Sequence, residues 1–185
     1  MVLTLHQSNP DFERRFSALL AAKREAAEDV DRAAREIVAR VRAEGDAALI
    51  EFTNRFDRLD VTAAGLAVSQ AEIDAAFASA SPEILAALTL ARDRIEAHHR
   101  RQMPVDDRYV DALGVELGSR WTAIGSVGLY VPGGTASYPS SVLMNAVPAK
   151  VAGVDRIVMV VPSPEGRLNP LVLAAARLAG VTEIY

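Results

Sequence analysis

The sequence predicts an α/β protein: an amino-terminal helical segment followed by half of a Rossmann-like parallel β-α-β-α-β unit. Residues 1–124 carry 37 of the 44 charged side chains, and residues 125–185 carry only 7. The spacing of apolar residues also changes after Gly114, from the three- and four-residue spacing of helices to the alternation and short apolar runs of strands. We therefore predict a mainly helical segment at 1–124 and half of a Rossmann-like unit at 125–185.

The composition excludes several classes of partner. The chain has 185 residues, of which half are apolar, so it can bury a substantial core. Its net charge of −4 disfavours nucleic acid and anionic lipid. There is no cysteine, no secretory signal pattern and no apolar run of about 18 residues. We expect a cytoplasmic protein with no nucleic-acid or membrane partner.

The first part of the chain contains several helix signals. Asn9 is the predicted cap of a first helix, with Pro10 and Asp11 in its first turn. A second helix is expected near residues 27–44, with one apolar stripe made by Ala34, Ile37, Val38 and Val41. Gly45 should end that helix in a left-handed conformation. Asp46 should then cap a helix that directs Leu49, Ile50 and Phe52 inward.

Two further helices are indicated by their capping residues. Ser69 and Glu72 have the spacing of a capping box. Ser81 followed by Pro82 indicates a helix start, and this helix should extend to about Arg101.

The second part of the chain alternates strand and helix patterns. Strands are expected around residues 115–117, 127–131 and 181–185. The continuous apolar run at residues 157–161 predicts a parallel strand that is covered on both faces. Helices are expected at about 140–152, with Pro148 inside it, and from the Asn169 cap to Gly180. Because the last strand is followed by no turn or polar tail, we expect the parent polypeptide to continue past Tyr185.

The segment at residues 125–141 is the most informative for function. A buried strand leads into Pro-Gly-Gly, then into a loop rich in hydroxyl groups, and then into a helix. Such a turn lies at the carboxyl end of a parallel strand, where open α/β sheets bind ligands, and the helix start offers free N–H groups. The spacing is not Gly-x-Gly-x-x-Gly, however. From the residues alone, a ligand loop and a purely structural tight turn both remain open.

Other groups that could carry chemistry have simpler interpretations. His98 and His99 are adjacent and diverge on a helix, and His6 lies near the terminus, so no zinc site is predicted in this chain. Asp106 and Asp107 follow Pro104 and are predicted to lie in a solvated loop. The arginines at 92, 94, 100 and 101 alternate with acidic residues, as in ordinary helix ion pairs. Ser140 and Ser141 are interpreted as helix-start hydroxyls because no histidine is placed to activate them.

Several segments resemble histidinol dehydrogenases. The run Val-Gly-Leu-Tyr-Val-Pro-Gly-Gly-Thr at residues 127–135, continued at 139–144 and 148–154, is similar to that family. Residues 41–49 and 52–57 resemble the family's helical entry segment, and residues 178–185 are also similar. The resemblance therefore covers essentially the whole chain, as the amino-terminal portion, or about the first 40%, of the family's length.

This resemblance implies a homodimeric, zinc-dependent enzyme that uses NAD to oxidise L-histidinol, through the aldehyde, to L-histidine in histidine biosynthesis. In the family, the tyrosine of the Gly-Leu-Tyr-Val-Pro-Gly-Gly motif contacts NAD, which carries over to Tyr130 alone. Gly133 and Gly134 are expected to shape the loop without a ligand contact. The zinc ligands, the catalytic Glu-His pair and the substrate-binding residues of the family lie beyond this chain. The resemblance thus implies that residues 1–124 are a mainly helical segment of an incomplete α/β domain. It also implies that residues 125–185 are a partial NAD-binding domain, truncated at its carboxyl end, and that the chain alone should be inactive.

Three interpretations from different classes follow. The first is part of an NAD-dependent dehydrogenase, the second a nucleotide-binding module without catalysis, and the third a helical dimerisation scaffold whose glycine turn is only structural.

Overall fold

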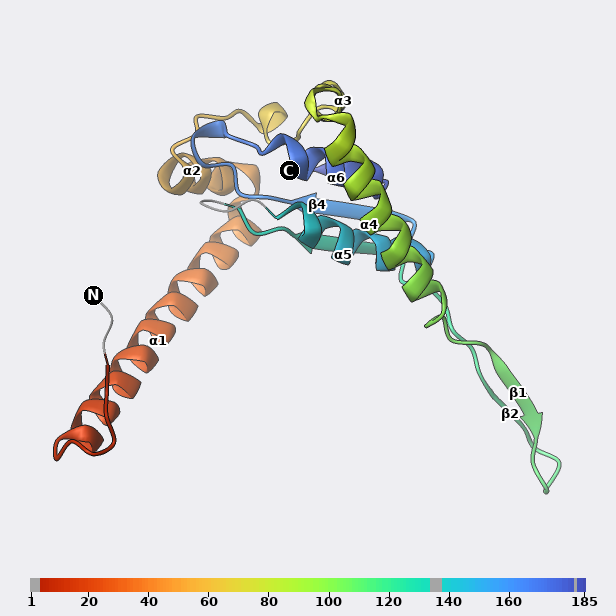
Figure 1. The fold of residues 1–185 in the computed structure, drawn as a ribbon, viewed down its shortest axis with the longest axis horizontal. Coiled ribbons are helices and arrows are strands. Elements are labelled where there is room, and N and C mark those ends of the chain that lie inside the picture. The colour runs from red at the N-terminus through yellow and green to blue at the C-terminus, as the bar shows by residue number, and fades with distance from the viewer. Residues whose placement is uncertain (1–3, 134–137, 182) are drawn as a thin grey trace. The chain divides into compact units, whose positions relative to one another are not determined.

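The computed structural model describes residues 4–133, 138–181 and 183–185, except for the side chains of residues 22–28. The chain divides into two compact units, Met1–Phe52 and Thr53–Tyr185 (Figure 1). The predicted boundary at residues 124 and 125 follows charge rather than contacts, and it stays a prediction. Within the described ranges, no single helix is long and apolar enough to cross a membrane.

The first unit is dominated by one long helix, α1 (Phe12–Glu44). The prediction of two separate helices here is wrong. The whole stretch lacks Gly and Pro and is rich in Ala, Leu, Glu and Arg, so nothing in it ends the helix. The predicted Asn9 cap is also wrong, because the helix is preceded by Asp11, whose side chain makes no capping hydrogen bond. Asn9 instead belongs to a turn in which its carbonyl accepts the N–H of Phe12 at 3.0 Å.

Gly45 ends α1 at the predicted position, although its ψ of −137° lies outside the left-handed helical region that was expected. Its φ is +63°, and its N–H donates to the carbonyl of Val41 at 2.9 Å. Helix α2 (Asp46–Asp57) begins at the next residue and buries Ala48 and Phe52, which lie four residues apart on one face. Leu49 is exposed, so the prediction that it points inward is wrong.

Arg40 joins the end of α1 to α2. Its guanidinium donates to Glu44 at 3.0 and 2.8 Å and to Glu51 at 2.9 and 2.7 Å, and lies 5.0 Å from the centre of the Phe52 ring. The hydrogen bonds to Glu51 and Glu44 raise the pKa of Arg40, and the bond from Arg40 lowers the pKa of Glu44. Bidentate pairing on both sides fixes the direction of the chain after Gly45.

The second unit begins with short helical elements whose caps match the predictions. After η1 (Ala63–Gly65), α3 (Gln70–Ser79) starts with the predicted capping box. The Ser69 hydroxyl accepts the N–H of Glu72 at 3.3 Å, and the Ser69 N–H donates to the Glu72 carboxylate at 2.8 Å. Helix α4 (Pro82–Arg100) is capped by the Ser81 hydroxyl and ends close to the predicted residue.

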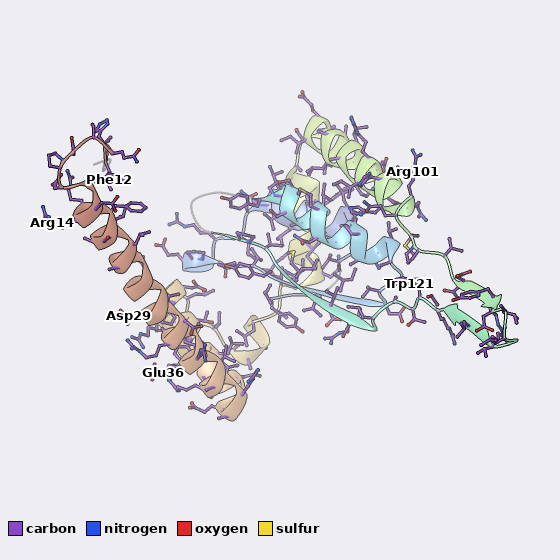
Figure 2. All side chains as sticks on the ribbon, turned by 90° about the horizontal axis from the view of Figure 1, so that it is seen from below. Phe12, Arg14, Asp29, Glu36, Arg101 and Trp121 are labelled. Carbon is purple, nitrogen blue, oxygen red and sulfur yellow. The ribbon has the colours of Figure 1, made fainter. Side chains whose placement is uncertain are left out.

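A two-stranded hairpin follows α4. It consists of β1 (Asp107–Val110) and β2 (Glu116–Ser119), which pair antiparallel with Tyr109 opposite Leu117. Every residue of both strands is exposed, as is Trp121, labelled in Figure 2 where the chain returns from β2. The prediction of a loop around Asp107 is wrong, because this residue begins β1. Neither face of this two-stranded ribbon is buried, so its sequence lacks the alternation of apolar and polar residues by which a strand is recognised.

The parallel unit is confirmed. Strands β3 (Ser126–Tyr130), β4 (Arg156–Val160) and β5 (Glu183–Ile184) form one sheet in the order β3-β4-β5, and both pairs are parallel. Helix α5 (Pro139–Val151) connects the first two strands. Helix α6 (Pro170–Leu178), preceded by η2 (Pro164–Gly166), connects the second and third. The Asn169 side chain caps α6 by accepting the N–H of Leu171 at 2.8 Å, as predicted.

One face of this sheet carries the core. Leu129, Met159 and Ile184 are buried, and they belong to one cluster with apolar residues of α5 and α6. Helices α3 and α4 form an outer layer, in which α3 packs against α6 and α4 against both α5 and α6. The outer layer is tied to α6 by Arg177, which bonds Asp74 at 2.7 Å and lies 4.4 Å from the centre of the Phe77 ring.

Within the second unit, the described residues leave the opposite face of the sheet partly open. Val160 is 43% exposed there, although its neighbour Met159 is fully buried. The prediction that β4 is covered on both faces is therefore wrong for this chain. A strand that is covered on one face needs an apolar residue only at every second position, whereas the apolar run of β4 is continuous.

Candidate functional site

Tyr130 lies at the carboxyl end of β3, as the sequence predicts. Leu129 and Val131 on either side are buried in the core, so the alternation of the strand directs Tyr130 to the open face of the sheet. Its side chain is 65% exposed. Strand register places Tyr130 opposite Val160 at the end of β4. Tyr130 therefore presents a largely free aromatic ring at the edge of the sheet where parallel α/β proteins bind ligands.

The turn after Tyr130 approaches the turn after β4 closely. The N–H of Val131 donates to the carbonyl of Val160 at 3.0 Å. A Cβ atom added to Gly133 would lie 2.7 Å from the carbonyl oxygen of Pro162, so only glycine fits without a shift. Gly133 thus shapes the loop through contact with its own chain. Gly134 lies outside the described residues.

Helix α5 begins just beyond this turn. Pro139, Ser140 and Ser141 form its first residues, which confirms the interpretation of the two serines as helix-start residues. The carbonyl of Tyr138 accepts the N–H of Ser141 at 3.0 Å. Because α5 follows β3, its positive end lies after the carboxyl end of the strand that carries Tyr130.

The carboxyl edge also includes a residue that the sequence reasoning did not single out, Tyr185. Its N–H donates to the carbonyl of Met159, and its carbonyl accepts the N–H of Val161, each at 2.9 Å. These two bonds place Tyr185 opposite Val160. The available signal was positional: in a β-α-β-α-β pattern, the residue that ends the third strand occupies the same edge as the residue that ends the first.

The same open face carries one ion pair further back along the strands. Arg156 on β4 donates to Glu183 on β5 at 2.8 and 2.6 Å. These hydrogen bonds hold the pKa of Glu183 below its usual range and raise that of Arg156. The two charges satisfy each other, so this pair does not present a free charge to a ligand at the edge.

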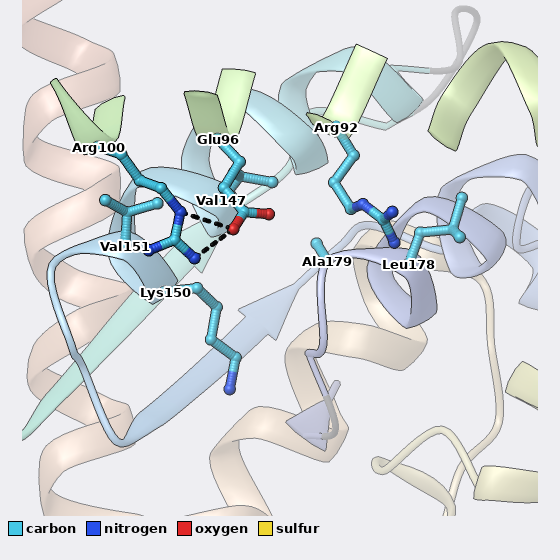
Figure 3. Close-up of a pocket in the computed structure, with 8 residues that line it drawn as sticks. All are labelled: Arg92, Glu96, Arg100, Val147, Lys150, Val151, Leu178 and Ala179. Atoms are coloured by element: carbon cyan, nitrogen blue, oxygen red, sulfur yellow. Dashed lines mark hydrogen bonds and ion pairs between the residues drawn. The ribbon is translucent and has the colours of Figure 1, made fainter. Parts of the chain in front are cut away.

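A small pocket lies among the other ends of the helices. Arg92, Glu96, Arg100 and Lys150 line it together with apolar residues of α5 and α6, and its volume is about 230 Å³ (Figure 3). Helices α5 and α6 end here, and cations are stabilised at the negative ends of helices. Arg100 also donates to Glu96 at 2.9 Å, and Arg92 donates to Asp93 at 2.9 Å. The predicted helix ion pairing is therefore confirmed for Arg100 with Glu96 and for Arg92 with Asp93.

An open hollow of about 530 Å³ runs along the β1-β2 hairpin and includes Asp106 and Asp107. The Asp106 carboxylate accepts the N–H of Trp121 at 2.8 Å and so links the segment before β1 to the segment after β2. We therefore assign Asp106 a structural role.

The described residues do not fit a zinc site. His98 and His99 lie at the end of α4 with ring centres 5.2 Å apart. Across the side chains of residues 4–21, 29–133, 138–181 and 183–185, no three His, Cys, Asp or Glu come together in a group that could hold a metal ion.

The comparisons with known proteins agree on one family. A family model described as histidinol dehydrogenase matches residues 20–185. The chain is 72% identical to the histidinol dehydrogenase of Brucella abortus and 67% identical to that of Mesorhizobium japonicum. Both matches cover 100% of this chain and 43% of the relative. A crystal structure of histidinol dehydrogenase from Elizabethkingia anophelis superposes with a TM-score of 0.77 at 32% identity, covering 84% of this chain and 36% of that one.

The chain thus spans less than half the length of the relatives it matches. The family model nevertheless covers nearly all of it, and the superposition extends the likeness to the fold. On this evidence, the chain belongs to the histidinol dehydrogenase family.

Proposed function

We propose that the whole protein containing this chain is an NAD-dependent, zinc-requiring histidinol dehydrogenase that oxidises L-histidinol, through the aldehyde, to L-histidine in histidine biosynthesis. The 72% identity to a relative of that name supports this proposal. The chain itself contributes one part of the NAD-binding surface.

The observation that carries this role is the placement of Tyr130. Its exposed ring stands at the carboxyl end of the first strand of a parallel β-α-β-α-β unit, next to a turn that only glycine permits. A phenol ring there can stack on a flat base and offer its hydroxyl as a hydrogen-bond donor or acceptor. The chemistry that NAD supplies when bound is acceptance of a hydride from the alcohol carbon.

The chain alone should not catalyse this reaction. Hydride transfer requires substrate, cofactor and proton acceptor to be held together at near-attack distance. The described residues fit no zinc site, and we assign none of them a catalytic role. We expect no zinc-dependent oxidation of histidinol by the 185-residue chain, measured as NADH absorbance.

The test uses the whole protein. Replacing Tyr130 by Ala should raise the apparent KM for NAD about 5- to 100-fold, because the stacking surface is lost, and leave the KM for histidinol nearly unchanged. Tyr130→Phe is the matched control, since it keeps the ring and removes only the hydroxyl. An unchanged KM for NAD in Tyr130→Ala would refute the assigned role.

We also propose that the whole protein is a cytoplasmic homodimer. Helix α1 supports dimerisation, because Phe16, Leu20, Val30 and Val38 lie within one stripe of this helix and are all exposed. Light scattering after size-exclusion chromatography should give twice the chain mass. A monomer mass at micromolar concentration would contradict the dimer.

The two non-enzymatic interpretations make different predictions for the isolated chain. A nucleotide-binding module should show saturation transfer from protein to NAD in ligand-detected magnetic resonance. A scaffold with a purely structural turn should show none, even at millimolar NAD, and should still self-associate.

A further inference from the structure

Three residues form a row across the carboxyl edge of the sheet. Tyr130 is opposite Val160 in the strand register, and two backbone hydrogen bonds place Tyr185 opposite Val160 on the other side. The row therefore reads Tyr, Val, Tyr across β3, β4 and the end of β5.

All three side chains point to the same face. Residues in register on neighbouring strands direct their side chains to the same side of a sheet. The preceding row of Leu129, Met159 and Ile184 is buried against the helices, with exposures of 8%, 0% and 1%. The Tyr-Val-Tyr row is consequently on the open face, and its exposures are 65%, 43% and 46% in chain order.

The spacing of this row suits a flat ring. Neighbouring strands are about 4.8 Å apart, so the Cα atoms of the two tyrosines are separated by roughly 10 Å. A planar ring in contact with an aromatic ring on each side needs about 7 Å between the outer two planes. The two tyrosine rings therefore need to lean inward by only about 1.5 Å each.

Val160 supplies a small apolar floor between the rings. The charged residues on this face in the described chain, Arg156 and Glu183, lie further back along the strands and bond each other. The row thus offers two aromatic rings, the apolar side chain of Val160 between them and two phenolic hydroxyl groups. These groups match a heteroaromatic base better than a phosphate or a carboxylate.

We propose that Tyr130 and Tyr185 are the two walls, and Val160 the floor, of a slot that holds one heteroaromatic base of the dinucleotide. This inference rests on the proposed function and adds Tyr185 and Val160 to the binding surface. Both the purine and the pyridine ring have the required flat shape.

The experiment measures NAD dissociation constants by titration calorimetry on the whole protein. Tyr185→Ala and Tyr130→Ala should each weaken binding about 5- to 100-fold through loss of stacking. Val160→Phe should weaken binding at least as much, because the added ring fills the slot. Val158→Ala is the matched control, since Val158 lies on the same face one row back, and its dissociation constant should change less than twofold.

Two further measurements sharpen the result. Tyr185→Leu retains apolar volume without a flat ring, so it should still weaken binding if Tyr185→Ala does not fold. Competition with adenosine monophosphate or nicotinamide mononucleotide identifies the base. The mononucleotide whose base occupies the slot should lose affinity in Tyr185→Leu, and the other should not.

The outcomes separate the two levels of the proposal. If Tyr130→Ala weakens NAD binding but Tyr185→Leu and Val160→Phe do not, the slot is wrong and the proposed function stands. If neither mononucleotide is affected by Tyr185→Leu, the slot is also wrong. If the unmodified whole protein does not bind NAD, the proposed function itself fails.

Discussion

Replacing Gly133 by Ala should destabilise the sheet edge that carries Tyr130. The new Cβ atom would lie 2.7 Å from the carbonyl oxygen of Pro162 and 3.3 Å from the Cβ and Cδ atoms of its ring. Ordinary contacts of a Cβ begin near 3.4 Å, so the two turns must separate by about 0.7 Å. Overpacking of this kind costs about 1–3 kcal/mol. The nearest atom is a backbone oxygen, which cannot move aside as a flexible side chain can, so we expect a cost in the upper part of the range of about 1–3 kcal/mol.

Thermal unfolding of the 185-residue chain, followed by circular dichroism, measures this cost. For a chain of this length, 1–3 kcal/mol lowers Tm by roughly 2–12 °C. Gly128→Ala is the matched control, because a Cβ there would meet no heavy atom within 4 Å. That variant should be unchanged or up to about 1 kcal/mol more stable. Equal melting temperatures for the two variants would refute the argument that close approach requires glycine at position 133.

Three further predictions concern the layers behind the edge. Leu143→Ala, at a residue that is 1% exposed, should lower the free energy of unfolding by about 2–5 kcal/mol in urea titration; a loss below 1 kcal/mol would contradict its placement in the core. Ser69→Ala should cost about 1 kcal/mol at pH 7 by loss of the capping box. The hydrogen bonds from Ser69 hold the pKa of Glu72 below its ordinary value, so this stabilisation is present above the ordinary carboxyl range and is lost as pH falls through the folded-state pKa. The gap between wild type and Ser69→Ala should therefore narrow below about pH 4, and a gap that widens there would contradict the assignment. Arg177→Met keeps the apolar stem but loses the bond to Asp74 and the contact with Phe77, so it should cost about 0.5–1.5 kcal/mol; Arg167→Met, whose pair with Glu165 is exposed, should change stability by less than about 0.5 kcal/mol in the same titration.

Local signals predicted most of the helix ends correctly, although the Asn9 cap was wrong. The Ser69 box, the Ser81 cap, the Asn169 cap and the helix end at Gly45 each depend on residues within four positions of one another. Such short-range hydrogen bonds are readable from a single sequence. The parallel sheet was also predictable, because apolar strands separated by helices have few other ways to pack.

The errors arose where no local residue decides the structure. The break expected before residue 27 rested on an apolar stripe rather than on a breaker, and α1 has none. Strand β1 was missed because both of its faces are exposed, so its sequence lacks a buried period. The prediction that both faces of β4 are covered was wrong because an apolar run shows only that a strand is suited to burial. It does not show whether the described residues include an element that packs on each face.

The candidate site was only partly predictable. The motif singled out Tyr130, whose contact with NAD stays a prediction, and the structure places this residue exposed at the end of β3. The alignment of Tyr185 with Val160 depends on pairing between segments 25 residues apart along the chain. Register of this kind is set by which side chains of the two strands are buried, here Ile184 beside Met159, and not by Tyr185 itself.

The order of the strands has a consequence for synthesis. Because β3, β4 and β5 are neighbours in space in the same sequence in which they are made, each new strand joins the free side of the one before it. No strand has to enter between two that are already paired. A ribosome releases chain at about 5–20 residues per second, far slower than helices and hairpins form. This layer can therefore assemble stepwise as it emerges.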